Sequence, residues 1–342
     1  VGTEQTNAAG SFDNLEVGKY KITATLSDGT PEKKKVEKTI NIKNLDDMSA
    51  YLFVHFVDTQ EDATREQIYF SVSKDGKTWT TLNNKQPYLT SNVGTQGVRD
   101  PYILRGEDGK FFIIATDLSV YNLKNNWTAA AQQGSKSIVV WESSDLVNWS
   151  EASLVKINND NAGCTWAPEA CYDPEKDEYM VFWASVVSDD SYQKYRIYRS
   201  YTKDFKTFSA PELYIEEPNA VIDTTIIDHE GTYYRFTKNE AKSSITMQEC
   251  TSLSGDWKDV ANYNLGSMTG YEGPTIYKLN GKNEWCLLLD YFSKSKGYKP
   301  FVTTDITKGE FTADSDFSFD GTYRHGTVMP ITQAEYESLT AE

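Results

Sequence analysis

Strand-like runs of apolar residues recur along this chain, and five of them end in the same kind of turn. Each run closes with Ser or Thr, continues through an acidic or polar turn, and leads into an aromatic residue. The copies are SKDGKTW (73–79), SSDLVNW (143–149), SYTKDFKTF (200–208), CTSLSGDW (250–257) and TTDITKGEF (303–311). Strand-rich units that repeat at this interval predict a radial or stacked array.

A second pattern recurs between these turns, in which a short apolar strand, a turn and an aromatic strand follow one another. It occupies residues 100–117, 167–185, 223–240 and 272–292. Three of the four turns contain a glycine, as a tight hairpin requires, and these are Gly109, Gly231 and Gly281. We therefore predict four units of four strands, ordered from a short inner strand to an outer strand that carries the aromatic residue.

The first copy of the turn motif lacks an inner strand of its own. It follows two apolar runs, YLFVHFV (51–57) and QIYFSVS (67–73), and the missing strand is available only in HGTVMPIT (325–332). Pairing the last strand with the first ones closes a ring and leaves no sheet edge exposed. This predicts an all-β, five-bladed β-propeller over residues 47–342, whereas a sandwich or an open solenoid does not explain the incomplete first unit.

Residues 1–46 differ from the rest of the chain. SFDNLEVGKYKITATLSDG alternates apolar and polar residues, breaks at Asp28 and Gly29, and is followed by the strand-like KKVEKTINI. We predict a short antiparallel unit of about three strands, which alone buries little apolar surface. The segment resembles the C-terminal half of bacterial immunoglobulin-like modules, and we interpret it as a partial immunoglobulin-like β module.

Composition excludes some classes of partner. The 342 residues carry a formal net charge of −16 and no basic run, so nucleic acid and anionic membranes are not expected partners. A neutral polymer such as a polysaccharide would not be repelled. No run reaches the length of a membrane span, and the chain opens on VGTEQTNAAG without Met or a signal sequence. We interpret it as a trimmed or matured piece of a longer protein.

Three acids stand at the starts of predicted inner strands, which line one mouth of a propeller channel. They are Asp100, Asp223 and Glu272, and the second unit has Ala167 near the matching position. Each acid alone could simply begin a turn. Three acids at repeat-equivalent positions favour a functional site instead, because converging carboxylates are unfavourable unless they are paired or used.

The inner-strand sequences GVRDPYI, GCTWAPEA, AVIDTT and GYEGPTIY occur in this order within residues 97–277. They resemble the blade starts of glycoside hydrolase family 43, and the resemblance covers about residues 48–333. It implies a five-bladed propeller that hydrolyses arabinose-, xylose- or galactose-containing plant polysaccharides with inversion. By the same resemblance, Asp100 is the general base, Asp223 orients the acid and holds up its pKa, and Glu272 is the general acid.

The segment before the first inner strand, together with RHGTVMPIT at the end, resembles an arabinosidase-type subgroup of that family. We therefore expect a secreted or cell-surface, inverting exo-acting α-L-arabinofuranosidase. Alternatives within the family are β-xylosidase, exo-β-1,3-galactanase, β-galactofuranosidase and endo-arabinanase. The alternative from another class is a propeller that binds glycans without cleaving them, against which the complete acid trio argues.

Five further residues are candidates for substrate binding. Trp166 could stack on a sugar face or pack between blades. Arg99 and Arg324 could bind sugar hydroxyls or pair with the acids. Tyr271 and Tyr291 are candidate pocket walls.

His325 is the candidate metal residue. RHGTVMPIT resembles the last blade of the same family, in which a His near the axis can help to hold a central calcium or sodium ion through water. We expect no required cofactor and regard a structural Ca²⁺ or Na⁺ as an open alternative. No HExxH motif, Cys/His cluster or GxSxG motif is present, so zinc and serine hydrolase chemistry have no support.

Overall fold

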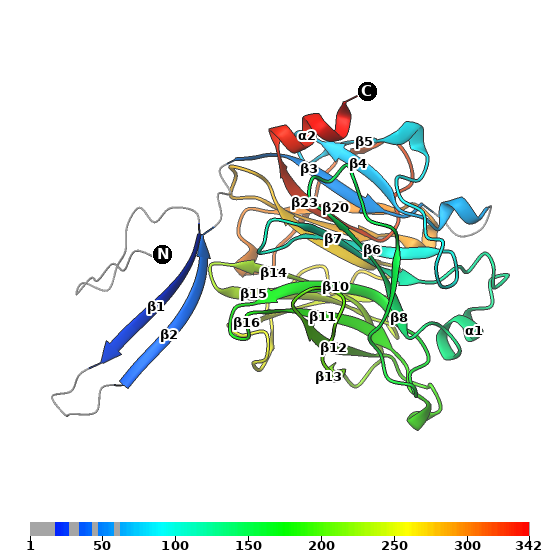
Figure 1. Cartoon of the computed structure of the whole chain (residues 1–342), viewed down its shortest axis with the longest axis horizontal. Coiled ribbons are helices and arrows are strands. Elements are labelled where there is room, and N and C mark those ends of the chain that lie inside the picture. The colour runs from blue at the N-terminus through cyan, green and yellow to red at the C-terminus, as the bar shows by residue number, and fades with distance from the viewer. Residues whose placement is uncertain (1–17, 27–33, 43–46, 58–61, 342) are drawn as a thin grey trace.

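The computed structural model describes residues 18–26, 34–42, 47–57 and 62–341. The main body consists of five β-sheets arranged as blades around a channel (Figure 1). The inner strands of neighbouring blades contact one another all the way round the ring. The prediction of a five-bladed, all-β propeller is therefore confirmed.

Four blades are regular, and each consists of four antiparallel strands in chain order from the channel outwards. The first two blades are β6 (Val98–Arg105), β7 (Phe111–Asp117), β8 (Ser137–Ser143) and β9 (Ser153–Lys156), then β10 (Trp166–Asp173), β11 (Glu178–Ser185), β12 (Arg196–Thr202) and β13 (Glu212–Ile215). The next two are β14 (Val221–His229), β15 (Thr232–Asn239), β16 (Ser244–Cys250) and β17 (Lys258–Asp259), then β18 (Glu272–Lys278), β19 (Trp285–Asp290), β20 (Tyr298–Thr303) and β21 (Thr312–Ala313).

The fifth blade joins the two ends of the propeller. Its order from the channel outwards is β23 (Gly326–Thr332), β3 (Met48–His55), β4 (Tyr69–Ser73), β5 (Thr78–Thr81) and β22 (Ser318–Phe319). β23 runs antiparallel to β3, with Val328 opposite Phe53, so the predicted closure is confirmed. The short β22, parallel to β5, was not predicted.

The repeated Ser/Asp turns have a structural role. In the first copy, Asp75 Oδ1 accepts hydrogen bonds from the backbone amides of Lys77 and Thr78, at 2.8 and 2.7 Å. Asp145 and Asp204 accept equivalent bonds in the next copies. These bonds fix the turn that precedes the outer strand, and the aromatic residue that follows then packs in the apolar core.

Helices are short and few in the described part of the chain. The α-helices are α1 (Trp127–Gln132) and α2 (Gln333–Thr340), and the 3₁₀ turns are η1 (Ala63–Arg65), η2 (Asn83–Lys85), η3 (Ser188–Asp190), η4 (Phe292–Lys294) and η5 (Ile306–Lys308). A capping box between Thr332 and Glu335 begins α2, which packs on β3 and β23 (Figure 1). Neither helix is long and apolar enough to cross a membrane.

The N-terminal segment is described only in part. β1 (Gly18–Leu26) and β2 (Lys34–Ile42) form an antiparallel hairpin, which accounts for two of the predicted strands. The other residues of the predicted 1–46 module lie outside the described ones. Its immunoglobulin-like character stays a prediction, as does the boundary at residue 46.

Candidate active site

A β-bulge near the start of each regular inner strand shapes one mouth of the channel. The residues at these four bulges share a left-handed backbone, and they are Asp100 (φ 50°), Ala167 (46°), Asp223 (48°) and Gly273 (52°). A bulge changes the direction in which successive side chains point. Two layers of side chains result, which we name the outer ring and the inner ring.

In the four regular blades the outer ring contains the residue just before each bulge, and the inner ring contains the bulge residue itself. Arg324 and His325, just before β23, complete the two rings in the fifth blade. The outer ring consists of Arg99, Trp166, Ile222, Glu272 and Arg324, all of which line one cavity. The inner ring consists of Asp100, Ala167, Asp223, Gly273 and His325. The prediction that the three acids occupy equivalent positions is therefore wrong for Glu272, which stands one residue earlier than Asp100 and Asp223.

His325 lies between the two acids of the inner ring. Its Nδ1 is 3.4 Å from Asp100 Oδ1 and 3.9 Å from Asp223 Oδ1. Burial disfavours the imidazolium, but the charges of Asp223 and Asp100 outweigh it and raise the pKa of His325 to about 9. The inner ring thus carries a positive charge between two carboxyl groups near neutral pH.

Asp100 is held in its ionised form. Burial opposes ionisation, but the contact with His325 outweighs burial and keeps the pKa of Asp100 below its usual value. The hydroxyl of Thr116 donates to Asp100 Oδ2 at 2.9 Å and accepts a hydrogen bond from the backbone amide of Ala167 at 2.7 Å. A carboxylate fixed in this way is suited to accept a proton from water.

Asp223 connects the two rings. Its Oδ2 accepts a hydrogen bond from the backbone amide of Gly273 at 3.1 Å, so it fixes the backbone next to Glu272. Burial raises the pKa of Asp223 to about 6, and the positive His325 opposes this rise. Asp223 is therefore placed to position the segment that carries Glu272.

Glu272 faces the cavity and contacts two cations. Lys238 Nζ donates a hydrogen bond to Glu272 Oε2 at 2.9 Å. Arg324 approaches Oε1 at 3.4 Å, while its Nε donates to the buried Asp290 at 2.6 Å. Arg324 was predicted to bind a sugar or to pair with the acids, and the structure shows the pairing. Lys238 and Asp290 were not predicted, because nothing near them in sequence marks them as site residues.

The cavity above the outer ring has a volume of about 520 Å³. Besides the outer-ring residues it is lined by Trp127, Tyr195, Lys238, Glu240, Phe292 and Ser295. Trp166 stacks on Tyr195 at a centroid distance of 5.4 Å and meets Trp127 edge-on at 6.1 Å. Trp166 thus packs against neighbouring aromatic residues and also lines the cavity, so both predicted roles fit its place.

Arg99 is buried at the cavity wall. Its guanidinium lies 4.4 Å from the ring centroid of Phe56 and 5.3 Å from that of Trp127. It pairs with Glu66 at 3.1 Å, and not with any of the three predicted acids. Glu66 is completely buried and was not predicted, because the contact spans 33 residues of sequence.

Tyr271 and Tyr291 are not brought to the cavity. Their rings stack on each other at 4.4 Å and pack with the apolar side chains between β15 and β19. Neither lines the cavity, whereas the neighbouring Phe292 does. Tyr271 is buried and Tyr291 is partly buried against the same apolar cluster, so their role as pocket walls stays a prediction.

His325, the candidate metal residue, has two carboxyl groups beside it, those of Asp100 and Asp223. Among the described residues, no group of three or more His, Cys, Asp or Glu side chains is placed to hold a metal ion. The predicted Ca²⁺ or Na⁺ near the axis stays a prediction.

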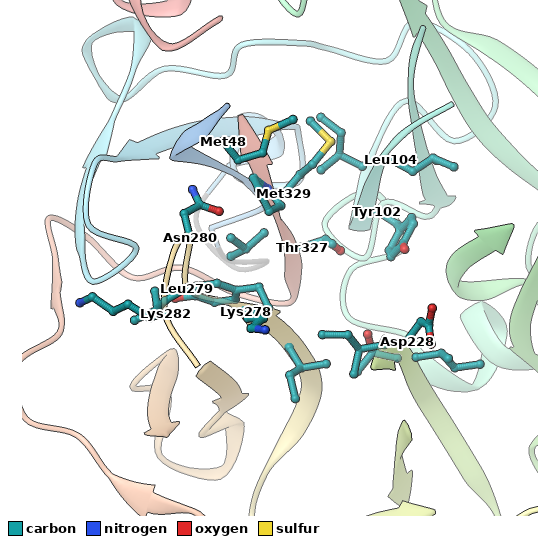
Figure 2. Close-up of a pocket in the computed structure, with 18 of the residues that line it drawn as sticks. Met48, Tyr102, Leu104, Asp228, Lys278, Leu279, Asn280, Lys282, Thr327 and Met329 are labelled. Atoms are coloured by element: carbon teal, nitrogen blue, oxygen red, sulfur yellow. The ribbon is translucent and has the colours of Figure 1, made fainter. Parts of the chain in front are cut away.

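A larger cavity of about 680 Å³ opens at the other end of the channel (Figure 2). It is formed by the far ends of the inner strands and by the turn after β18, and its labelled residues include Leu104, Leu279 and Met329. Asp228 is the single acid in its lining. Since hydrolysis needs two carboxyl groups, this mouth lacks the chemistry of the first one.

Comparisons with known proteins identify the family of the chain. Residues 46–337 match the family described as "Probable glycosyl hydrolase domain", a relative of glycoside hydrolase family 43. An α-L-arabinofuranosidase of Bifidobacterium longum subsp. longum is 30% identical over an alignment of 345 positions, and the alignment covers 86% of this chain. The match spans about a third of that protein, 32% of its length.

Two solved structures resemble the fold more distantly. A thermostable family-43 glycoside hydrolase has a TM-score of 0.48 and 19% identity, covering 69% of this chain and 77% of that one. The catalytic domain of the Coprinopsis cinerea GH62 α-L-arabinofuranosidase has a TM-score of 0.47 and 17% identity, covering 67% and 71%. Neither likeness bears on the residues of the site.

Proposed function

The chain belongs to the glycosyl hydrolase family related to glycoside hydrolase family 43, and from this we propose that it is an inverting exo-glycosidase, an α-L-arabinofuranosidase acting on plant polysaccharides. The observation that carries the proposal is the pair of carboxyl groups at two depths of one mouth. Asp100 in the inner ring is held ionised, while Glu272 in the outer ring faces the cavity.

In this proposal Asp100 is the general base and Glu272 the general acid. Inversion requires a base that activates water on one side of the sugar and an acid that protonates the leaving oxygen on the other. The contact with His325 keeps Asp100 ready to accept a proton from water. Asp223 acts through the backbone of Gly273 and is a positioning residue for Glu272.

The choice of arabinose rests on the relative from Bifidobacterium longum, whose described activity is that of an α-L-arabinofuranosidase. A cavity of about 520 Å³ has room for a terminal sugar, which suits exo action. Secretion or display at the cell surface belongs to the same proposal, because plant polysaccharides are too large to enter a cell. Xylose- and galactose-releasing activities, endo-arabinanase action and glycan binding without cleavage are outcomes that the experiment distinguishes.

The test is sugar release from aryl glycosides and from arabinose-, xylose- and galactose-based polymers, with NMR to follow the configuration of the released sugar. We expect arabinose, released with inverted configuration. Glu272→Gln should lower the rate about 10²- to 10⁴-fold on a substrate with a poor leaving group, and much less on a dinitrophenyl glycoside that needs no acid.

Glu284→Gln is the matched control, because Glu284 pairs with Lys77 away from the cavity and its loss should leave the rate unchanged. Release of xylose or galactose alone would leave the proposed mechanism standing and refute the proposal that arabinose is the sugar released. Glycan binding without release of any sugar would refute the proposal that the protein is an enzyme. If Glu272→Gln keeps its activity on the substrate with the poor leaving group, the assignment of Glu272 as the general acid is refuted.

A further inference from the structure

The segment between β7 and β8 carries two exposed aromatic side chains. Tyr121 is 42% exposed and Trp127 is 46% exposed. Among the exposed large apolar side chains of the described residues, these two are the aromatic ones. Isolated exposed apolar residues need no explanation, but two aromatic rings gathered in one segment indicate a binding surface.

This segment begins at the mouth of the channel that contains the outer ring. β7 ends at Asp117, which lies opposite Val98, the first residue of β6. The chain therefore leaves β7 beside Arg99, which follows Val98 and lines the cavity. Trp127 lines the same cavity, whereas Tyr121 does not. One exposed ring thus stands at the cavity and the other stands outside it.

The backbone that carries Tyr121 is fixed by buried groups. The completely buried Glu66 accepts hydrogen bonds from the backbone amides of Val120 and Tyr121, at 3.0 Å each. Leu118 and Val120 are buried and form a small apolar cluster with Ala130 of α1. The Tyr121 ring is therefore exposed on a backbone that is already held in place, which lowers the entropy lost on binding.

Trp127 is oriented by its neighbours without being buried by them. The Arg99 guanidinium lies 5.3 Å from its ring centroid, and Trp166 meets it edge-on at 6.1 Å. Trp127 is also the first residue of α1, where the side chain of Asn126 accepts a hydrogen bond from the Ala129 amide at 3.1 Å. These contacts fix the indole and leave nearly half of its surface exposed.

The proposed substrate has to extend beyond the cavity. A volume of about 520 Å³ has room for a terminal sugar, so the rest of a polymer lies across the mouth. A sugar ring has a face of C–H groups that packs on an aromatic ring, while its hydroxyl groups stay in water. With a formal net charge of −16, the chain suits a neutral polymer better than an anionic one.

We propose that Tyr121 forms a second sugar subsite outside the cavity, where a sugar of the polymer stacks while the terminal sugar lies in the cavity beside Trp127. The inference rests on the proposed function and extends it from the terminal sugar to the polymer. Tyr121 then contributes to the binding of substrates that are long enough to reach it, whereas Trp127 contributes to the binding of short and long substrates alike.

The test compares KM for p-nitrophenyl α-L-arabinofuranoside, which contains one sugar, with KM for soluble arabinan. Tyr121→Ala should raise KM for arabinan about fivefold, the size expected for one stacking contact, and leave KM for the aryl glycoside unchanged. Tyr121→Phe keeps the ring and should keep both KM values. Because the side chain is exposed, both variants should fold, which thermal denaturation checks.

Leu154→Ala is the matched control. Leu154 is 43% exposed on β9, the outer strand of the same blade, and does not line the cavity, so both KM values should stay unchanged. A KM for arabinan that changes less than twofold in Tyr121→Ala would overturn the inference. So would an equal rise for both substrates, or a loss in Tyr121→Phe as large as that in Tyr121→Ala.

Direct binding separates this inference from the proposed function. If no substrate releases sugar, the proposed function is wrong, and slower migration in a native gel that contains arabinan still measures the subsite. Tyr121→Ala should then be slowed less than the unmodified protein, and equal slowing would refute the subsite. If sugar is released while Tyr121→Ala keeps both KM values, only the subsite is refuted.

Discussion

Replacing Glu66 with Gln tests whether a buried carboxylate far from the proposed chemistry holds the cavity wall together. Glu66 accepts hydrogen bonds from Arg99 Nη1 at 3.1 Å and, at 3.0 Å each, from the Ser119 hydroxyl and the backbone amides of Val120 and Tyr121. It thus joins Arg99 to the segment that leads into α1 and Trp127. Glutamine keeps the shape of the side chain and removes its charge.

The expected loss follows from these four contacts. Whichever way the amide turns, its NH₂ group faces one of the two backbone N–H donors, and an unpaired buried donor costs about 1–3 kcal/mol. The buried guanidinium of Arg99 also loses its anionic partner. Breaking a buried pair by removing one partner costs about 3–5 kcal/mol in total, and we expect a loss of unfolding free energy in that range.

Urea denaturation followed by tryptophan fluorescence measures this loss, and Glu142→Gln provides the matched control. Glu142 pairs with Lys110 and Lys206 at the surface, where such pairs contribute about 0–1 kcal/mol. In the sugar-release assay, Glu66→Gln should raise KM more than it lowers kcat, because Arg99 and Trp127 line the cavity. An unfolding free energy within about 1 kcal/mol of the unmodified protein would refute the reasoning.

Two further predictions concern the inner ring and the cavity wall. The folded pKa of His325, about 9, lies above its unfolded value of 6.5, so its stabilisation is complete below pH 6.5 and is lost as the pH rises through 9. His325→Gln should therefore remove about 3 kcal/mol of this pH dependence, measured by urea unfolding between pH 6 and 9.5, and an unchanged slope would contradict the assignment. Trp127→Ala should raise KM about tenfold through loss of stacking, while Leu213→Ala, an equally exposed apolar residue on β13, should not change KM.

The fold could be predicted from sequence because its determinants are local and repeated. The Ser/Asp turns satisfy their hydrogen bonds within three residues, as Asp75 does with Thr78. Each copy can therefore be recognised from its own short stretch of sequence. The closure of the ring could be predicted because the first unit lacks an inner strand and the end of the chain supplies one more strand than the last unit needs. β22 pairs only Ser318 and Phe319 with β5, which is too short for any periodic pattern to show.

Contacts between distant segments could not be predicted in this way. Lys238 reaches Glu272 across 34 residues, and Arg99 reaches Glu66 across 33. Lys238 and Glu66, taken alone in sequence, resemble ordinary surface charges. The stacking of Tyr271 on Tyr291, 20 residues further along the chain, was likewise not predicted.

The offset of Glu272 was visible in the sequence, but aligning the acids with one another concealed it. Asp100, Ala167 and Gly273 each precede a proline, so alignment on Pro101, Pro168 and Pro274 places Glu272 one residue earlier, level with Arg99 and Trp166. At these three bulges a proline fixes the backbone after the left-handed residue, and the bulge separates the two rings. The offset has a chemical consequence, since acids in one ring would share one environment. Placed in different rings, the proposed base meets the buried His325 while the proposed acid meets Lys238 and faces the cavity, so the two carboxyl groups lie in different surroundings.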